Sequence, residues 1–459
     1  MSTVKPILLR NVCIADELVD IRFAERVLAI GALTQQPGDR LIEGGGTTLL
    51  PGLHDHHFHF MAYAAYRQSV DVFSCTDQAA LMAQLSRADT GDWIRGVGYH
   101  EARHGQLERQ DLDAIEAPLR LQHRSGKFWL LNTRALHELD LWQADHAGVE
   151  RDAQGAPTGR LFRMDQLLRE RIPRLSLDIR GTVQALRQHG LTGITDASHT
   201  NDAKAAETLE NLRQIDTTID LGLNVFCMGD LSVAPGPHKV MLDDDHLPDF
   251  DTVVANVRAA HEQDRGAAFH CISRTELVFA LAVLQTAGMH TADRIEHGSL
   301  IAEDLIPMLQ DTGVVVVSQP GFIGHRGDFF SASVAADERR DLYRYSSLLA
   351  AGVPTLASSD APYGPVDPWR IMANAVGRRT ESGSELNLQE RVSGMQALSG
   401  YLTAPAAPGR RQRTITVGQP TNLCLLDRPL AEAVSALDQV KVRATWIAQD
   451  FSNAPVHLA

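Results

Sequence analysis

Two histidines, His57 and His59, stand two positions apart, and this pair is the first place in the sequence that indicates chemistry. They end residues 49–59, Leu-Leu-Pro-Gly-Leu-His-Asp-His-His-Phe-His, a stretch with the composition of a strand. Residues i and i+2 of a strand face the same side, so both imidazoles can point at one metal ion. The pair alone is a weak signal, because a chain with 19 histidines contains some close pairs by chance. The metal hypothesis therefore depends on further ligands elsewhere in the chain.

Three further candidate ligands each follow an apolar run with the composition of a strand. They are His270, His297 and Asp360. Taken singly, a histidine at such a place is more often a polar cap, and an aspartate before Ala-Pro more often begins a turn. In this order along the chain, however, four histidines and one aspartate match a borderline or hard divalent metal such as zinc, iron or manganese.

The elements that must position these side chains alternate short apolar strands with amphipathic helices, which predicts an α/β fold with a parallel sheet. We expect helices over residues 251–263 and 276–287. Eight strands are predicted, the number in a (β/α)8 TIM-like barrel, where active-site groups come from the C-terminal strand ends. The predicted strands are residues 49–53, 119–122, 193–196, 239–242, 267–270, 294–297, 314–318 and 354–359.

Both ends of the chain are also rich in predicted strands. These are residues 7–10, 27–31, 47–50, 414–418, 422–427 and 440–447. We expect residues 1–50 and 410–459 to meet in one small β domain, entered through a linker at 404–409. The catalytic barrel would then span residues 51–409, with an insertion around 60–190 over the active-site face.

Composition limits the function classes. A net charge of -14 argues against a nucleic-acid binder, and 44% hydrophobic residues are ordinary for a globular enzyme. The five cysteines are scattered and form no CxxC pair, which excludes a zinc ribbon and makes a disulfide framework improbable. We find neither a signal segment nor a membrane-spanning run, so we expect a soluble cytoplasmic enzyme without membrane partners.

Several short motifs, spread over nearly the whole chain, together resemble those of one protein family. They are Pro51–His59, Trp93–Tyr99, Asn132–Leu136, Pro157–Gly159, Gly193–Thr195, Arg294–His297, Ser318–Pro320, Ser359–Pro362 and Asp367–Pro368. With them the chain resembles the amidohydrolase superfamily, and within it the N-substituted formamide deformylase-like branch. The resemblance implies a (β/α)8 barrel with a small β-sandwich domain formed by both termini.

By the same resemblance, the candidate ligands would form one or two metal sites. His57 and His59 would bind the more buried ion, and His270 and His297 the second. Lys239 matches a lysine that is often carboxylated in such enzymes and then bridges two ions; a surface lysine is the alternative. We expect Zn²⁺ as the first choice, with Mn²⁺ or Fe²⁺ as alternatives.

The implied chemistry is attack of a metal-activated water on a carbonyl or amidine carbon. Asp360 would touch the metal, accept the water proton and pass it to the leaving nitrogen. His297, a second catalytic candidate, or Tyr99 and His100 on the insertion would hold the developing oxyanion. Lys127 would contact a substrate carboxylate or carbonyl, and each insertion residue could equally be an ordinary loop residue. Glu296 is predicted either to orient a ligand or to be a surface carboxylate.

We therefore predict a hydrolase of a non-peptide C–N bond in a small molecule, an amide, formamide or cyclic amide. A mononuclear deaminase of a heterocyclic ring is the alternative, and a carboxylated Lys239 would discriminate the two. A catalytically retired binding protein is a third interpretation. Substrate specificity is expected from residues 60–190, 321–326 and 363–365, and a homodimer follows from family analogy alone. Four cationic side chains could recognise an anionic substrate: His325, Arg326, Arg378 and Arg379.

Overall fold

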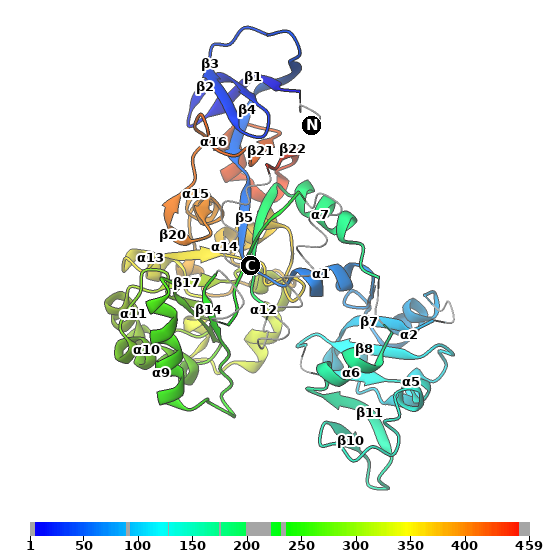
Figure 1. The fold of residues 1–459 in the computed structure, drawn as a ribbon. Helices are drawn as coiled ribbons and strands as arrows, with labels where there is room; N and C mark the ends of the chain where they lie inside the picture. Colours follow the sequence, from blue (N-terminus) through cyan, green and yellow to red (C-terminus); the bar gives the residue numbers. More distant parts are fainter. Residues whose placement is uncertain are drawn as a thin grey trace. The chain divides into compact units, whose positions relative to one another are not determined.

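The computed structural model describes residues 5–88, 92–126, 128–173, 176–198, 222–230 and 236–448. The chain divides into two compact units, each with its own sheets and cores (Figure 1). Unit 1 comprises Met1–Phe60 and Ile179–Ala459, and unit 2 comprises Met61–Asp178. Among the described residues, no helix combines the length and apolar character that a membrane crossing requires.

Eight parallel strands of unit 1 form two sheets, one ordered β13-β12-β5 and the other β14-β15-β16-β17-β18. The runs of valine and alanine in the second sheet are buried on both faces, as is usual for parallel strands. The strands are β5 (Leu53–Phe58), β12 (Leu191–Asp196), β13 (Asn224–Cys227), β14 (His238–Val240), β15 (Ala267–Cys271), β16 (Arg294–His297), β17 (Val315–Ser318) and β18 (Thr355–Ala357).

The outer strands of these two sheets approach one another at both edges. Gly229, just after β13, makes an isolated parallel bridge with His238 at the start of β14. At the other edge, Phe58 makes a parallel bridge with Ala361, beyond β18. Two backbone hydrogen bonds of 2.9 Å support this second contact: Asp360 N–H donates to His57 O, and His59 N–H donates to Ala361 O. The carboxyl end of β5 therefore lies directly beside the segment after β18.

Helices follow the strands of unit 1 and cover their sheets. The predicted helices are confirmed as α9 (Phe250–Glu262) and α10 (Arg274–Ala287), which pack on the core formed with β15 and β16. Ser273 and Glu276 form a capping box that fixes where α10 begins. The other helices are α7 (Ile179–Gln188), α11 (Ile306–Thr312), α12 (Gly321–Ser333), α13 (Ser346–Ala350), α14 (Pro368–Gly377), α15 (Gly394–Tyr401), α16 (Leu430–Ser435) and the 3₁₀ turns η1 (Glu303–Leu305), η2 (Arg339–Asp341), η3 (Leu388–Glu390) and η4 (Leu437–Gln439).

Strands from both ends of the chain meet in one six-stranded sheet, ordered β22-β21-β4-β1-β2-β3. Antiparallel pairing of Leu49 with Leu425 joins the two ends, and both leucines lie in the core that these strands share. The strands are β1 (Ile7–Ile14), β2 (Glu17–Phe23), β3 (Val27–Gly31), β4 (Arg40–Pro51), β21 (Leu423–Leu426) and β22 (Val442–Trp446). The arrangement as a sandwich and the boundaries at residues 50 and 410 stay predictions.

Unit 2 contains a mixed six-stranded sheet, ordered β10-β11-β9-β8-β7-β6. Both faces are covered, because Phe128 and Leu130 pack in one core while Trp129 and Leu131 pack in another. The strands are β6 (Val70–Asp71), β7 (Ile94–Tyr99), β8 (Leu119–His123), β9 (Phe128–Leu131), β10 (Val149–Arg151) and β11 (Pro157–Phe162). The helices are α1 (Phe60–Arg67), α2 (Gln78–Ser86), α3 (Glu101–His104), α4 (Arg109–Leu112), α5 (Thr133–Glu138) and α6 (Asp165–Arg171).

Several predicted elements were wrong. Residues 119–122 are not a strand of unit 1 but part of β8 in unit 2, and the missing eighth parallel strand is β13. Residues 414–418 form a loop and turn, not a strand. The predicted linker at 404–409 is a hairpin of β19 (Thr403–Ala404) and β20 (Ala407–Gln412).

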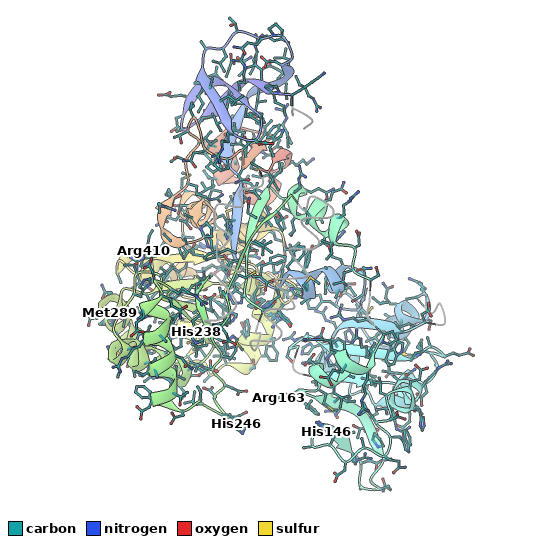
Figure 2. All side chains as sticks on the ribbon, viewed as in Figure 1. His146, Arg163, His238, His246, Met289 and Arg410 are labelled. Atoms are coloured by element: carbon teal, nitrogen blue, oxygen red, sulfur yellow. The ribbon has the colours of Figure 1, made fainter. Side chains whose placement is uncertain are left out.

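Figure 2 shows the side chains of both units. In unit 1, His238 is the first residue of β14 and is buried, whereas Met289, after the end of α10, is exposed to solvent.

Candidate metal centre

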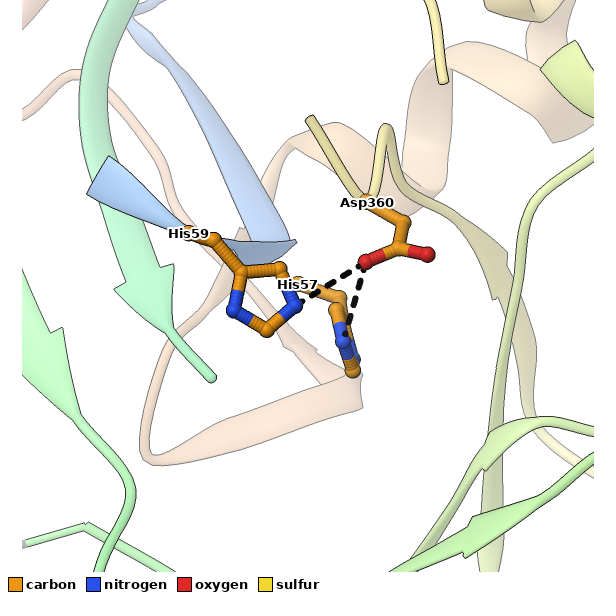
Figure 3. A group of neighbouring side chains, drawn as sticks. All are labelled: His57, His59 and Asp360. Atoms are coloured by element: carbon orange, nitrogen blue, oxygen red, sulfur yellow. Dashed lines mark ion pairs between the residues drawn. The ribbon is translucent and has the colours of Figure 1, made fainter. Parts of the chain in front are cut away.

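His57, His59 and Asp360 come together at the contact between the end of β5 and the segment after β18 (Figure 3). Asp360 Oδ1 lies 3.5 Å from His57 Nε2 and 3.1 Å from His59 Nε2. The three ligand atoms lie within 4.8 Å of one another, and both His57 and Asp360 are buried. Two imidazole nitrogens and a carboxylate oxygen form a donor set that zinc, iron and manganese accept.

A buried hydrogen bond fixes which nitrogen of His57 faces Asp360. Glu296 Oε2 lies 2.5 Å from His57 Nδ1, and Arg294 pairs with the same carboxylate. A carboxylate can only accept, so His57 Nδ1 is the donor and His57 Nε2 bears a lone pair. Burial, followed by the charge of Lys239, lowers the pKa of His57, which keeps the ring neutral.

The lone pair on His57 Nε2 thus faces a carboxylate oxygen across 3.5 Å. Burial acts to raise the pKa of Asp360, but the hydrogen bond from the His59 side chain, the largest of the opposing causes, holds it below its ordinary value, so the carboxyl is ionised. Two acceptors that face one another in a buried place are satisfied by a cation that binds both. The residues present therefore fit a divalent metal.

His270 and His297 form a second pair of imidazoles beside the first. His297 Nε2 lies 2.9 Å from His270 Nδ1, and the His57 and His297 ring centroids are 4.8 Å apart. Gln319 Oε1 accepts from His297 Nδ1 at 2.9 Å, because the Gln319 amide nitrogen donates to Val317 O and Ser358 Oγ. In this tautomer, His297 Nε2 also bears a lone pair. Both pairs of histidines can therefore offer nitrogen ligands to metal.

The backbone at two of these residues is strained. His297 has φ +70° and Asp360 has φ +52°, in the left-handed region that residues other than glycine rarely occupy. The buried carboxylate of Asp55 helps to hold the conformation at Asp360, because it accepts from the backbone N–H groups of Ser359 and His57, both at 3.2 Å. Burial raises the pKa of Asp55 to about 7. Such strain is typical of functional sites, where surrounding contacts enforce it.

Lys239, the second residue of β14, is 7% exposed, so the alternative of a surface lysine is wrong. Burial lowers the pKa of Lys239, and the charges of Glu296 and Asp360 act in the opposite direction. A lysine whose pKa is lowered has more of the neutral amine that carboxylation requires. The surroundings of Lys239 are therefore compatible with the predicted modification.

The residues predicted to contact substrate from the insertion belong to unit 2. The Tyr99 hydroxyl donates to Gly105 O at 2.9 Å and accepts from Leu107 N at 3.0 Å, contacts that hold its own loop. Burial, the largest of several causes, lowers the pKa of His100 to about 4. Lys127 lies outside the described residues. The role of these three residues at the substrate stays a prediction.

Two polar residues that the sequence did not single out for the site, Gln319 and Asp55, hold the ligands in place. Gln319 stands in the motif Ser318–Pro320, for which the sequence predicts no role. Asp55 stands two residues before His57, in the stretch 49–59 that has the composition of a strand. For both residues, the sequence signal was a position near the end of a strand-like stretch. The neighbouring residues in the sequence did not show that either side chain is buried.

The parallel strands and the site together define an α/β enzyme with a centre suited to a divalent metal. Residues 40–450 match the Amidohydrolase family, and the chain belongs to that family. It is accordingly a hydrolase that acts on carbon–nitrogen bonds other than peptide bonds. The resemblance predicted from the motifs, including the N-substituted formamide deformylase-like branch, is confirmed.

Individual relatives agree with this assignment. The chain is 26% identical to the N-substituted formamide deformylase of Arthrobacter pascens over 532 aligned positions, which cover 97% of this chain and 96% of the relative. An uncharacterised metal-dependent hydrolase from Pyrococcus horikoshii has a similar fold, with a TM-score of 0.68 and 18% identity over 88% of this chain and 96% of its own. A 5-methylcytosine deaminase from Klebsiella pneumoniae gives a TM-score of 0.52 at 15% identity, over 96% of both chains.

The contact between Glu296 and His57 leads to a first prediction. Glu296→Gln removes the charged acceptor that holds His57 Nδ1–H, so we expect metal affinity to fall about 10- to 100-fold. Competition with a chromophoric chelator measures that affinity. Arg294 loses its charged partner in the variant, so the titration is made well below the unfolding temperature. Glu303→Gln, at an exposed glutamate, is the matched control. Unchanged affinity in Glu296→Gln would show that Glu296 does not orient His57.

Proposed function

We propose that this chain is a metal-dependent amidohydrolase that cleaves an amide, formamide or cyclic amide bond in a small molecule. His57, His59 and Asp360 would hold the metal. The proposal rests on one observation, that His57 Nε2 and Asp360 Oδ1 face one another across 3.5 Å in a buried place. Zn²⁺ is the first candidate for three such ligands, and Mn²⁺ or Fe²⁺ are the alternatives.

We further propose a second metal site at His270 and His297, with a carboxylated Lys239 as the ligand common to both ions. The short distance between the two imidazoles and the burial of Lys239 support it. An unmodified lysine cannot serve as the common ligand, because an ammonium group has no lone pair and a neutral amine has only one. With an unmodified Lys239, the same residues would favour the mononuclear deaminase.

A bound divalent ion would supply Lewis acidity and lower the pKa of a water molecule. The residues of the chain would transfer the proton and orient the ligands. Asp360, ionised and fixed by its strained backbone, accepts the proton of the attacking water and delivers it to the leaving nitrogen. Gln319 keeps the proton of His297 on Nδ1, so Nε2 is suited to ligation rather than to donation toward an oxyanion.

We propose that the two parallel sheets of unit 1 form one closed eight-stranded barrel. The bridge between Gly229 and His238 and the bridge between Phe58 and Ala361 lie at the two edges where the sheets would join. In a barrel, active-site groups come from the carboxyl ends of the strands. His57, His270 and His297 stand at or near such ends.

A substrate panel tests the proposed function. Protein loaded with Zn²⁺ or Mn²⁺ is offered N-formyl amines, N-acyl compounds, cyclic amides and aminated heterocycles, and the release of amine and of ammonia is measured. We expect turnover of at least one amide or formamide. Ammonia release from heterocycles alone would favour the deaminase. Protein that neither binds metal nor turns over any compound would favour the retired binding protein, and Asp360→Asn protein controls for contaminating enzymes.

A further inference from the structure

His59 is a candidate ligand whose ring has little to orient it. The ring of His57 is held by Glu296 through Nδ1. For His59, the contacts within the described ranges are Asp360 Oδ1, 3.1 Å from Nε2, and neighbouring rings such as that of Tyr363, and they include no hydrogen bond to Nδ1. The position of His59 therefore depends mainly on its backbone.

The backbone of His59 is held on both sides. His59 is the single residue between β5, which ends at Phe58, and α1, which begins at Phe60. Its own N–H donates to Ala361 O at 2.9 Å. The N–H of Phe60 donates to a side chain, Asp196 Oδ2, also at 2.9 Å. The two peptide groups that flank His59 are thus fixed by the segment after β18 and by the end of β12.

Asp196 is itself fixed in the orientation that this contact needs. It is the last residue of β12 and is 3% exposed. Its Oδ1 accepts from the N–H of Ser198, two residues later, at 2.9 Å, an Asx-type turn that orients the carboxyl group. Its Oδ2 receives Phe60 N–H, which at the first position of a helix has no partner within that helix. Asp196 therefore supplies, from another strand, an acceptor that the start of α1 lacks.

The pairing of β5 with β12 is irregular just before this point. Ile194 pairs with Asp55, but Asp196 pairs with Phe58, so β5 advances three residues while β12 advances two. His57 lies within this irregular part. A bulge redirects the side chains beside it, and bulges are common next to active sites. Beyond the bulge, the side chain of Asp196 continues the contact between the two strands and fixes where β5 ends.

We propose that Asp196 is a positioning residue of the metal centre, which holds Phe60 N–H and thereby fixes His59 as a ligand. It acts on His59 through the backbone, as Glu296 acts on His57 through the ring. The inference rests on the proposed metal site and adds β12, a strand that supplies none of the predicted ligands. Loss of a partner that orients a ligand lowers metal affinity about 10- to 100-fold.

Cobalt titration of two variants tests the role of Asp196. Co²⁺ is added to metal-free protein, calorimetry measures its affinity, and the visible absorption of the bound ion reports the arrangement of its ligands. We expect Asp196→Ala to lower the affinity at least tenfold and to change the absorption spectrum. Asp196→Asn keeps one acceptor oxygen, so this variant should lose less.

Asp293→Ala is the matched control, because Asp293 is also a buried aspartate that accepts from backbone. It accepts from the N–H groups of Ala267 and His290 at 2.8 and 2.7 Å, and it contacts His261 as well. It precedes the amino end of β16, whereas the candidate ligand of that strand is at the carboxyl end. We expect Asp293→Ala to unfold at a lower temperature than wild type but to bind Co²⁺ with unchanged affinity and spectrum.

The outcomes separate positioning from general stability. If either alanine variant does not fold, the two asparagine variants provide the same comparison. Unchanged binding of Co²⁺ in the Asp196 variants, or equal losses in the Asp196 and Asp293 variants, would overturn the inference and leave Asp196 a structural residue.

The titration also distinguishes this inference from the proposed function, because it involves no assay of activity. If Co²⁺ binds as expected but no compound is turned over, only the hydrolase proposal fails. A wild type that binds no Co²⁺ would refute the metal site, and the role of Asp196 with it.

Discussion

Asp360→Asn is expected to lower kcat by about 10³-fold, about 4 kcal/mol in activation free energy, while the protein keeps its metal. Asparagine has the shape of aspartate and keeps one oxygen for ligation. It also tolerates the left-handed backbone, where Asp360 has φ +52°. It cannot accept a proton, however, so the proton of the attacking water has no acceptor. Steady-state kinetics and metal analysis of the same preparation measure both effects.

Two further variants separate the roles of base and ligand. Asp360→Ala removes the carboxylate altogether, so both turnover and metal content should fall. Asp304→Asn alters an exposed aspartate on η1 that pairs with Arg274, and neither quantity should change. Near-normal turnover of Asp360→Asn with full metal content would refute the assignment of Asp360 as the base.

The strands that end in candidate ligands could be predicted because each is a local pattern. The run before His270 is short and apolar, and Arg294–His297 is one of the short motifs; both are strands with nearly the predicted bounds. The approach of Asp360 to His57 was beyond such patterns. It depends on the contact between Phe58 and Ala361, which are far apart in the sequence. The order of the motifs, and not any single motif, indicated that these side chains belong together.

Errors arose where local pattern does not determine the partner of a strand. Residues 119–122 alternate apolar and polar side chains, a strand pattern that does not identify a partner, and they pair within unit 2. Strand β13 (Asn224–Cys227) is only four residues long and was missed. A short strand is defined mainly by the neighbour it pairs with, and here that neighbour is β12, more than twenty residues earlier.

The orienting residues show the same limit. Arg294 and Glu296 are two apart on β16 and therefore share a face, so their ion pair could have been expected from the sequence. The hydrogen bond from His57 to Glu296 spans 239 positions and could not. The sequence left open whether Glu296 was a surface carboxylate. The structure shows that Glu296 is completely buried and contacts His57.

His57→Ala should reduce metal affinity at least 100-fold. Loss of an orienting partner already costs about 10- to 100-fold, and His57 is itself a candidate ligand. At saturating metal, a hundredfold loss of affinity removes about 2.7 kcal/mol of the stabilisation that the ion gives the folded chain. The added metal should therefore raise the unfolding temperature of wild type more than that of the variant. Calorimetric unfolding with metal and with a chelator measures this without any assay of activity.

His54→Ala is the matched control, because His54 is also a buried histidine of β5. Its Nε2 contacts Thr195 Oγ1 at 2.9 Å, and it is absent from the group around Asp360. We expect this variant to be less stable than wild type but to respond fully to metal. Equal responses of His57→Ala and His54→Ala would contradict a metal site at His57. If wild type binds two ions and His57→Ala retains one, the remaining ion would support a second site at His270 and His297, since these side chains do not depend on His57 for their own contact.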